Sequence, residues 1–528
     1  MSDRKLRWLG LGLAATAGAG VLGLTAMMNP TVARADGDDI GLVIGASGLP
    51  LPTAMSDMHE YVQAANGQYL NNPYTQFYPD LTFYQATSTD PTNPGFYGPG
   101  VFTPEGLYPL TGAGVHQLYL NYPTADDGFP SLSSSVGQGM AILESTIAAD
   151  QAAGDASTVF GYSQSSTIAS YVMAQLDPSG TPQTGALDPQ FLLVADPSNP
   201  NGGALERFAG FETTSGTTVS DPLNLPSLGF VFDSSTPSDD YVTNIYTLEY
   251  DGFADFPRYP LDFLSDLNAF LGIATLHGTY LNGFEPGNGG PSAEEIGTAT
   301  PLPGSMDSPT DPCTDCLTNY YIIDETPPLV AALPKALQDL LGPDLTYLIN
   351  LGYGDGSLGY SVDADSPANV ATPFGLFPDV SLSTVLSTLV TDTEQGITTL
   401  ENDPTAWTSL LEPGLSGQTL TELLSTLGTV AANPAATLTD LVNAISSAAS
   451  AAYSTLLPLA DIGNALLTSL PAYDLSLFTE NLSNGDLLDA IGLPIAADTG
   501  MGTLFAGFAL AVVDHAVTQI SADFSGLF

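Results

Sequence analysis

The stretch Thr158-Val159-Phe160-Gly161-Tyr162-Ser163-Gln164-Ser165 joins a short apolar strand pattern to a turn of small residues. Residues 165–176 follow with helical spacing, because Ile168, Tyr171, Val172 and Leu176 share one face. A tight turn from strand to helix exposes a serine hydroxyl and aims the helix N-terminus at a developing oxyanion. The stretch therefore predicts a serine nucleophile for acyl transfer at Ser163.

Two observations limit the specificity of this motif. The usual pattern has glycine two residues after the serine, and Ser165 stands there instead. The same tripeptide also occurs as Gly359-Tyr360-Ser361, where Val-Asp and no helical pattern follow. Only the strand before and the helix after distinguish Ser163, and the alternative is an ordinary strand–turn–helix connection.

Strand and helix patterns alternate around this turn. The expected strands are residues 40–44, 158–160, 191–195 and 242–250, and helices are expected at 134–153 and 165–176. Such alternation predicts an α/β-hydrolase fold with a mostly parallel sheet covered by helices. Residues 285–312 are rich in Gly, Pro, Ser and Thr and predict a long surface loop.

The composition changes after about Pro378 to Leu, Thr, Ala and Ser. Residues 382–400, 419–430 and 437–457 have helical spacing. We therefore expect a signal peptide at 1–35, a hydrolase domain at 36–378 and a separate helical C-terminal region at 379–528.

The charge of the chain is strongly acidic. It has 7 Lys+Arg against 57 Asp+Glu over 528 residues, and no Lys or Arg follows Lys335. Such a chain repels nucleic acid and anionic membrane surfaces. We therefore expect no nucleic-acid partner.

The first 35 residues have the pattern of a secretory signal. Arg4, Lys5 and Arg7 precede a mostly apolar stretch from Trp8 to Met28, and Ala33-Arg34-Ala35 provides a small-x-small cleavage site. This pattern predicts a secreted or cell-envelope protein. An uncleaved membrane anchor is the alternative, since the apolar stretch approaches the length of a span.

The catalytic base follows by elimination among four histidines. In this fold the chain order is serine, acid, histidine. His59 and His116 precede Ser163, and His515 lies in the apolar C-terminal region. His277, within the α/β region, is therefore the predicted base.

Three aspartates between Ser163 and His277 could orient the imidazole from the end of a strand. Asp251 ends the strand at 242–250, Asp255 follows in the same loop, and Asp196 ends the strand at 191–195. Asp251 is the first choice, Asp255 the second and Asp196 the third, because the segment after Asp196 has the composition of a structural turn.

The oxyanion hole needs two N–H donors. Gln164, directly after the nucleophile, supplies one backbone N–H. The loop Gly45-Ala46-Ser47-Gly48 follows an early strand, and its small residues allow backbone to approach substrate. Ser47 and Gly48 are therefore the second candidates.

Cys313 and Cys316 are the two cysteines of the chain. In an exported protein this spacing favours a small disulfide loop over a redox centre. A zinc site would need a second Cys or His pair, and none stands nearby in the sequence. We therefore expect a disulfide and no metal.

Taken together, four motifs resemble the PE-PPE C-terminal domain, a cutinase-related α/β-hydrolase domain of mycobacterial exported proteins. They are residues 161–165, Asp196-Pro197 with 201–203, residues 250–257 and residues 277–280, and the resemblance spans roughly residues 40–355. It implies a serine esterase with a Ser-Asp-His triad and no cofactor. Asp251-Gly252-Phe253 also resembles the acid loop of cutinases, which supports Asp251 over Asp255.

The resemblance implies an acyl ester or glycolipid substrate and association with cell-envelope lipid. Many members of the family carry an N-terminal PE or PPE helical domain, where this chain has the signal pattern. A subgroup built this way transfers acyl groups onto trehalose glycolipids, so the acceptor is either water or a sugar. The alternative is a non-catalytic envelope protein that uses the fold as a binding scaffold.

Overall fold

The computed structural model describes residues 39–45, 61, 64–74, 81–82, 101–102, 132–208, 224–225, 230–232, 235–281, 290–309, 312–313, 316–363, 366–403 and 456–525. The predicted signal peptide at 1–35 lies outside these residues.

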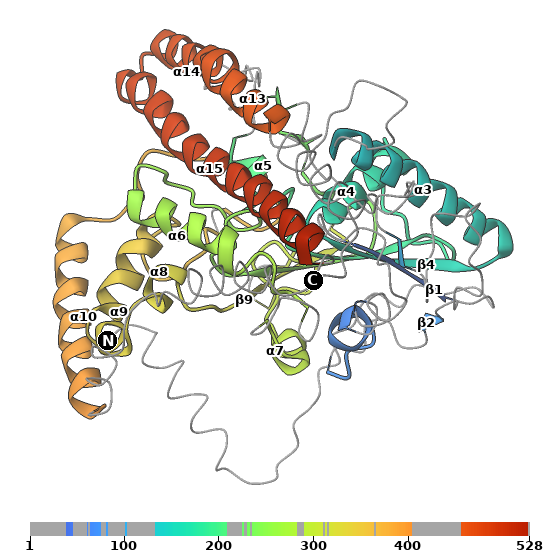
Figure 1. Ribbon diagram of the computed structural model, residues 1–528, viewed down its shortest axis with the longest axis horizontal. Helices are drawn as coiled ribbons and strands as arrows, with labels where there is room; N and C mark the ends of the chain where they lie inside the picture. Colours follow the sequence, from blue (N-terminus) through green and yellow to red (C-terminus); the bar gives the residue numbers. More distant parts are fainter. Residues whose placement is uncertain are drawn as a thin grey trace, which may run out of the picture. The chain divides into compact units, whose positions relative to one another are not determined.

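A parallel sheet of seven strands is the frame of the molecule (Figure 1). Its order is β2-β1-β4-β5-β8-β9, with β3 paired to β1, and every one of these pairings is parallel. The strands are β1 Asp39–Ile44, β2 Leu81–Thr82, β3 Val101–Phe102, β4 Ala156–Tyr162, β5 Gln190–Val194, β8 Thr243–Leu248 and β9 Thr318–Ile323. A separate antiparallel pair joins β6 Asn224–Leu225 to β7 Phe230–Val231. The predicted α/β fold is confirmed.

Both faces of the central strands are buried. On one face Val159 of β4 packs in a core with α3 and α4, represented by Leu143 and Ile168. On the other face Phe160 contacts Tyr69, whose ring also lies against Tyr246. Successive residues of a strand point to opposite faces, so β4 needs apolar residues at consecutive positions.

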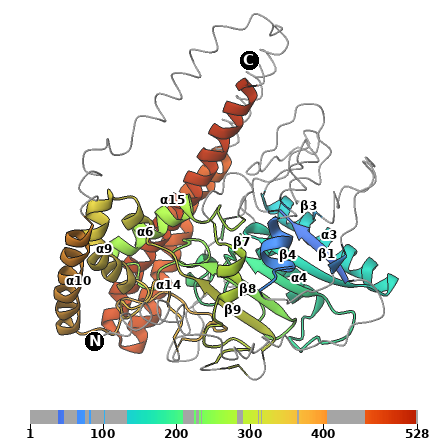
Figure 2. The ribbon, with the colours of Figure 1, turned by 90° about the horizontal axis from the view of Figure 1, so that it is seen from below.

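Helices fill the connections between the strands (Figure 2). They are η1 Asn66–Leu70, α3 Leu132–Ala153, α4 Gln164–Leu176, α5 Ala204–Arg207, α6 Phe263–Thr275, α7 Ala293–Thr298, α8 Pro328–Ala331 and α9 Lys335–Leu351. Helix α7 lies within the segment expected to be a loop. Ser292 starts it with a capping box, accepting from the backbone N–H of Glu295, whose side chain in turn accepts from the backbone N–H of Ser292.

The C-terminal helices share a hydrophobic core with the α/β part. They are α10 Leu382–Asn402, α13 Leu456–Asn464, η4 Ala465–Ser469, α14 Leu470–Asn484 and α15 Leu487–Ser525. Leu493 and Met501 of α15 lie in one cluster with Phe208, Phe256 and Ile273. Helix α10 forms where the sequence predicted it, while residues 419–430 and most of 437–457 lie outside the described residues. The domain boundary at residue 378 stays a prediction.

One described helix is long and apolar enough to cross a membrane, namely α15 over Leu487–Leu510. Half of that stretch is buried inside the protein, where it packs against α6 and its neighbours. This packing accounts for part of its apolar character without a membrane.

Candidate active site

The serine turn at the end of β4 has a strained backbone. Ser163 has φ 58° and ψ −116°, and its N–H donates to Val194 O at 3.0 Å. A Cβ on Gly161 would lie 2.9–3.0 Å from the backbone of Ser165 and Ser166, so only glycine fits there. This is the geometry in which a strand-to-helix turn presents a nucleophile.

Strain of this kind gathers at one edge of the sheet. In the described part of the chain, the non-glycine residues with positive φ are Ser163, Ala195 and Tyr250. They follow β4, β5 and β8, which are neighbours in the sheet. Strained backbone persists where surrounding structure holds it, and it clusters at functional sites. The carboxyl edge of the sheet is therefore the place to look for chemistry.

Ser165, which departs from the usual glycine, anchors the turn through its side chain. Its buried Oγ accepts from the N–H of Tyr162 at 2.7 Å. The same hydroxyl lies 3.3 Å from Ile44 O and 3.0 Å from Tyr162 O, so it also donates to the backbone. Glycine could make neither contact, and the serine thereby ties the turn to the end of β1.

The structure brings the three predicted catalytic residues together. Ser163 Oγ lies 2.8 Å from His277 Nε2, and His277 Nδ1 lies 2.9 Å from both Oδ1 and Oδ2 of Asp251. Ser163 follows β4, Asp251 follows β8, and His277 follows α6. Phe253 packs edge-on against the imidazole with ring centroids 4.8 Å apart, which fixes the ring plane.

The other two carboxylates have structural contacts. Asp255 accepts from the N–H of Tyr250 at 2.9 Å, and burial raises its pKa well above the ordinary value. Asp196 accepts from Ser198 N–H and Thr236 Oγ1, and burial raises its pKa to about 6. Of the three candidate carboxylates, Asp251 is the one that is hydrogen-bonded to the imidazole of His277.

Two tyrosines that the sequence reasoning missed hold this arrangement. Tyr280 OH donates to Asp251 Oδ2 at 2.8 Å and accepts from Leu248 N–H at 2.8 Å. Burial, reinforced by the charge of Asp251, raises the Tyr280 pKa well above its ordinary value, so the phenol keeps its proton. Tyr162 OH donates to the carbonyl of His277 at 2.6 Å. Tyr280 lies three residues after His277 in the sequence, and this short separation is the signal that could have identified it as part of the site.

The predicted oxyanion donors are described in part. Gln164 begins α4 directly after the nucleophile and is fully buried. Its backbone N–H lies at the helix N-terminus, where a negative charge is favoured. Ser47 and Gly48 lie outside the described residues.

The structure describes the other residues considered from the sequence only in part. His59 and His116 lie outside the described residues, and of His515 only the backbone, in α15, is described. Cys313 and Cys316 form a disulfide. Among the described residues no cluster of three His, Cys, Asp or Glu side chains could hold a metal.

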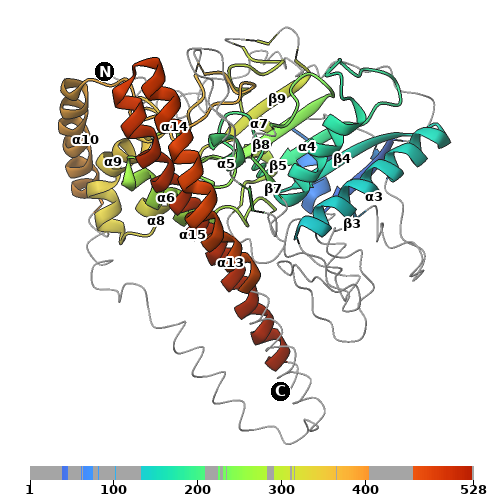
Figure 3. The same cartoon turned by 90° about the horizontal axis from the view of Figure 1, so that it is seen from above.

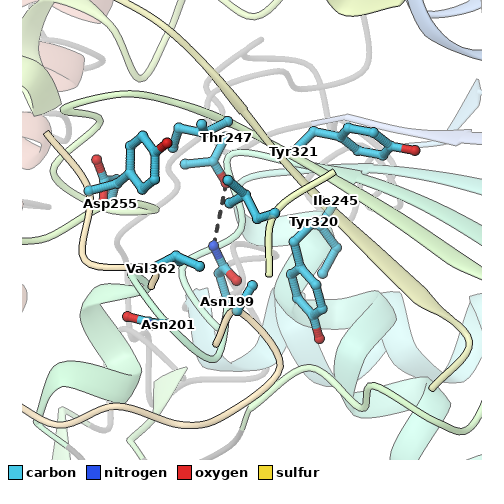
Figure 4. Close-up of a pocket in the computed structure, with 12 residues that line it drawn as sticks. Asn199, Asn201, Ile245, Thr247, Asp255, Tyr320, Tyr321 and Val362 are labelled. Atoms are coloured by element: carbon cyan, nitrogen blue, oxygen red, sulfur yellow. Dashed lines mark hydrogen bonds between the residues drawn. The ribbon is translucent and has the colours of Figure 1, made fainter. Parts of the chain in front are cut away.

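A small cavity with a mixed polar and apolar lining lies on a different part of the sheet (Figure 4). Asn199, Thr247 and Tyr320 line it, and Asn199 Nδ2 donates to Thr247 Oγ1 at 3.4 Å. Its lining does not include Ser163, Asp251 or His277. Asp255 does line it, which agrees with a structural environment for that carboxyl.

Comparison with known proteins identifies the family. The PE-PPE domain model matches residues 94–354. The chain is 37% identical over 536 residues to the uncharacterized PPE family protein PPE28 of Mycobacterium tuberculosis, covering 96% of this chain and 70% of that protein. It is 33% identical to the esterase PE16 of the same organism, over 65% of this chain and 52% of that protein. It is 37% identical to the PE family protein PE3, over 50% and 51%.

The chain thus spans about half the length of PE16 and PE3. No solved structure matches. The motifs at the carboxyl edge of the sheet, the family model and the long match to a PPE family protein agree, and the chain belongs to the PE-PPE domain family.

Proposed function

We propose that this protein is a serine esterase that acts on acyl esters. One observation supports this above all, namely the continuous hydrogen-bonded series from Ser163 through His277 to Asp251 on a strained turn. A serine hydroxyl is a weak nucleophile unless an adjacent base takes its proton. The esterase name of one relative is in keeping with the proposal.

In the first half of the reaction, the Ser163 hydroxyl proton passes to His277 Nε2 while Oγ attacks the ester carbonyl carbon. Asp251, held at 2.9 Å from Nδ1, stabilises the resulting imidazolium. The N–H of Gln164 stabilises the tetrahedral oxyanion. As the ester C–O bond breaks, the leaving alcohol takes the proton from Nε2, and the acyl group stays on Ser163.

In the second half an acceptor hydroxyl attacks the acyl-serine. His277 removes its proton, and the bond to Ser163 Oγ breaks as that oxygen regains a proton. Water as acceptor gives hydrolysis, and a sugar hydroxyl such as that of trehalose gives acyl transfer. We propose hydrolysis as the basal reaction and transfer as a further reaction of the same acyl-enzyme. Incubation of the protein with an activated ester and trehalose, followed by mass spectrometry of the products, distinguishes hydrolysis from transfer, because only transfer gives an acylated sugar.

Fluorophosphonate labelling of the full chain tests the proposal. The probe phosphonylates only an activated serine, so we expect one adduct, mapped by peptide mass to Ser163. His277→Ala should abolish the adduct because the serine loses its base, while His515→Ala should leave it. No adduct on the folded wild-type protein would favour the binding-scaffold alternative.

We also propose that the protein is exported to the cell envelope. The basic residues Arg4, Lys5 and Arg7, the apolar stretch and Ala33-Arg34-Ala35 support export. The intact mass of the protein from the envelope fraction tests this. A mature chain starting at Asp36 is expected, and an unprocessed chain in the cytosolic fraction would contradict export.

A further inference from the structure

Exposed apolar side chains are concentrated in the C-terminal helices. Of the 22 large apolar residues that are exposed in the described part of the chain, 16 lie at or after Phe377. Scattered exposed apolar residues are ordinary, whereas a contiguous group marks an interaction surface. The question is whether these residues form such a group.

Six of them line one side of a helical hairpin. Helices α14 and α15 run side by side and reverse direction at Gly485, which has φ 85° (Figures 1 and 3). Their inner sides enter the core through Tyr473, Leu477 and Leu493. The exposed residues are Leu475, Phe478 and Leu482 on α14 and Leu488, Ile491 and Ile495 on α15, each 38–65% exposed. We call these six residues the outer apolar face.

Their spacing places the six residues in three pairs, each with one residue on α14 and one on α15. On each helix they follow one another at intervals of three and four, so each set forms a single stripe. Because the chain reverses at Gly485, residues whose separations from it are equal or differ by one lie at about the same level of the hairpin. Leu482 therefore lies level with Leu488, Phe478 with Ile491, and Leu475 with Ile495.

The two stripes lie on the same side of the hairpin. The carboxyls of Asp474 and Asp498 interact across the two helices, so they mark the edge at which α14 faces α15. On each helix the exposed stripe lies next to the aspartate around the helix, and the core residues lie on the other side of that aspartate. The outer apolar face is thus one continuous surface across two helices.

Charge decides what can cover this surface. The chain has a formal net charge of −50, and no Lys or Arg follows Lys335. A second copy would bring the same charge, and an anionic lipid surface would also be repelled. We propose that the outer apolar face docks the protein on a lipid surface without net charge. This goes beyond the proposed chemistry, since it concerns how the protein meets lipid.

The docking helix is also connected to the candidate active site. Phe508 of α15 packs on Phe253 with ring centroids 5.1 Å apart, and Phe253 packs on His277. Ile495 and Phe508 are separated by 13 residues, or about 20 Å of helix at 1.5 Å per residue. One continuous helix therefore joins the lipid-facing surface to the wall of the site.

Flotation with vesicles tests the proposal on the full chain. We expect binding to phosphatidylcholine vesicles and weaker binding when phosphatidylglycerol is added. The triple variant Phe478→Gln, Ile491→Gln, Ile495→Gln should bind phosphatidylcholine at least about ten-fold more weakly, because three exposed apolar side chains are lost. The matched control is Leu382→Gln, Leu386→Gln, Val390→Gln, which removes three apolar residues of α10 that are more exposed than those of the hairpin triple. It should bind as the wild type does, and an equal loss in both triples would overturn the proposal.

A single-cysteine probe reads the contact directly. The two native cysteines are paired, so Ile491→Cys supplies one free thiol for an environment-sensitive fluorophore. We expect a blue shift with phosphatidylcholine vesicles. An unreactive thiol without vesicles would mean that residues 404–455 cover the face. If light scattering finds that the wild-type protein is a dimer and that the hairpin triple variant is a monomer, a second copy covers the outer apolar face. Either result would overturn the proposal, as would wild-type protein that fails to float.

The docking test is separate from the test of the chemistry. Ser163→Ala should float as the wild type does, and the hairpin triple should hydrolyse a soluble short-chain ester at the wild-type rate. Flotation of the wild type with no esterase activity would contradict the proposed function alone. Esterase activity without flotation would contradict the docking surface alone.

Discussion

Gly161-Tyr162-Ser163 and Gly359-Tyr360-Ser361 share three residues and have opposite surroundings. Ser163 is half-buried at the end of a strand, and its hydroxyl lies 2.8 Å from an imidazole. Ser361 is buried, donates to Asn201 Oδ1 at 3.0 Å and accepts from the guanidinium of Arg207. The first serine faces a base that can take its proton, whereas the second satisfies a buried cation.

Even the two glycines are required for different reasons. A Cβ on Gly161 would press on the backbone of the following turn, and one on Gly359 would lie 2.2 Å from the ring of Tyr250. The comparison teaches that a tripeptide gains chemistry from its place at the carboxyl edge of a parallel sheet and from the helix that follows. Its composition alone does not distinguish a nucleophile from a structural hydroxyl.

The largest expected effect separates the two serines. Ser163→Ala should lower kcat for a p-nitrophenyl ester by about 10⁴–10⁶-fold, since triad members act as a unit. Ser361→Ala should leave the activity per folded molecule unchanged and lower the free energy of unfolding by about 1–3 kcal/mol, because a buried guanidinium loses an acceptor. Initial rates and urea unfolding measure the two effects. The assignment of Ser163 would fail if its variant stayed active while the Ser361 variant did not.

The same contrast applies to two carboxylates four residues apart. Asp251→Asn should lower kcat on the order of 10⁴-fold, because an amide holds the wrong tautomer of His277. Asp255→Asn should keep most activity and lower stability by about 1 kcal/mol through its bond to Tyr250 N–H. Steady-state kinetics with thermal unfolding measures both. An inactive Asp255 variant beside an active Asp251 variant would reverse the roles.

The local parts of this site could be predicted from the sequence. The strand, turn and helix around Ser163 are contiguous, and the elimination of histidines uses chain order for His59 and His116 and the apolar sequence around His515. Asp251, Asp255 and Asp196 all follow strands. The sequence therefore gives an order of preference among them, but it does not show which carboxylate contacts His277. The choice depends on where α6 places His277, and this position is set by packing between residues that are far apart in the sequence.

Other parts were out of reach for the same physical reason. Ser165 bonds to Ile44, more than a hundred residues away, and no local pattern reveals that partner. Helix α15 is apolar on most sides, so its periodicity does not say which side enters the core. Packing against α6 and α14 decides that side, and the outer apolar face is what remains.

A smaller effect is expected from Tyr280→Phe. The change removes a hydrogen bond to the Asp251 carboxylate, which should lower kcat/KM about ten-fold, in line with the value of bonds to charged groups. A carboxylate with one donor fewer interacts more strongly with the imidazolium, so the acidic limb of the pH–rate profile should move to higher pH. Tyr69→Phe is the control, because its hydroxyl donates to the backbone carbonyl of Tyr280. If both variants leave the limb in place, Tyr280 only fills space.

The smallest effect on activity, and a clear one on stability, is expected at Asp266, where α6 meets α15. This buried carboxyl accepts from Thr503 Oγ1 at 3.3 Å, and burial raises its pKa to about 8. An unfolded aspartate titrates near pH 4. Between about pH 4 and 8 the folded protein therefore keeps a proton that the unfolded chain has lost. Stability conferred by this group is fully present below about pH 4 and is lost as pH rises to 8, at up to about 1.4 kcal/mol per pH unit.

Asp266→Asn should flatten the dependence of Tm on pH, because an amide does not titrate. The variant and the wild type should differ little at pH 4, and the variant should have the higher Tm at pH 8, with kcat unchanged at both. Differential scanning calorimetry at intervals of one pH unit measures this, with Glu394→Gln on the exposed side of α10 as the control. Parallel wild-type and Asp266→Asn profiles would show that the contact between α6 and α15 carries no linked proton. A fall in kcat would instead connect that contact to the Ser163 site through Phe508 and Phe253.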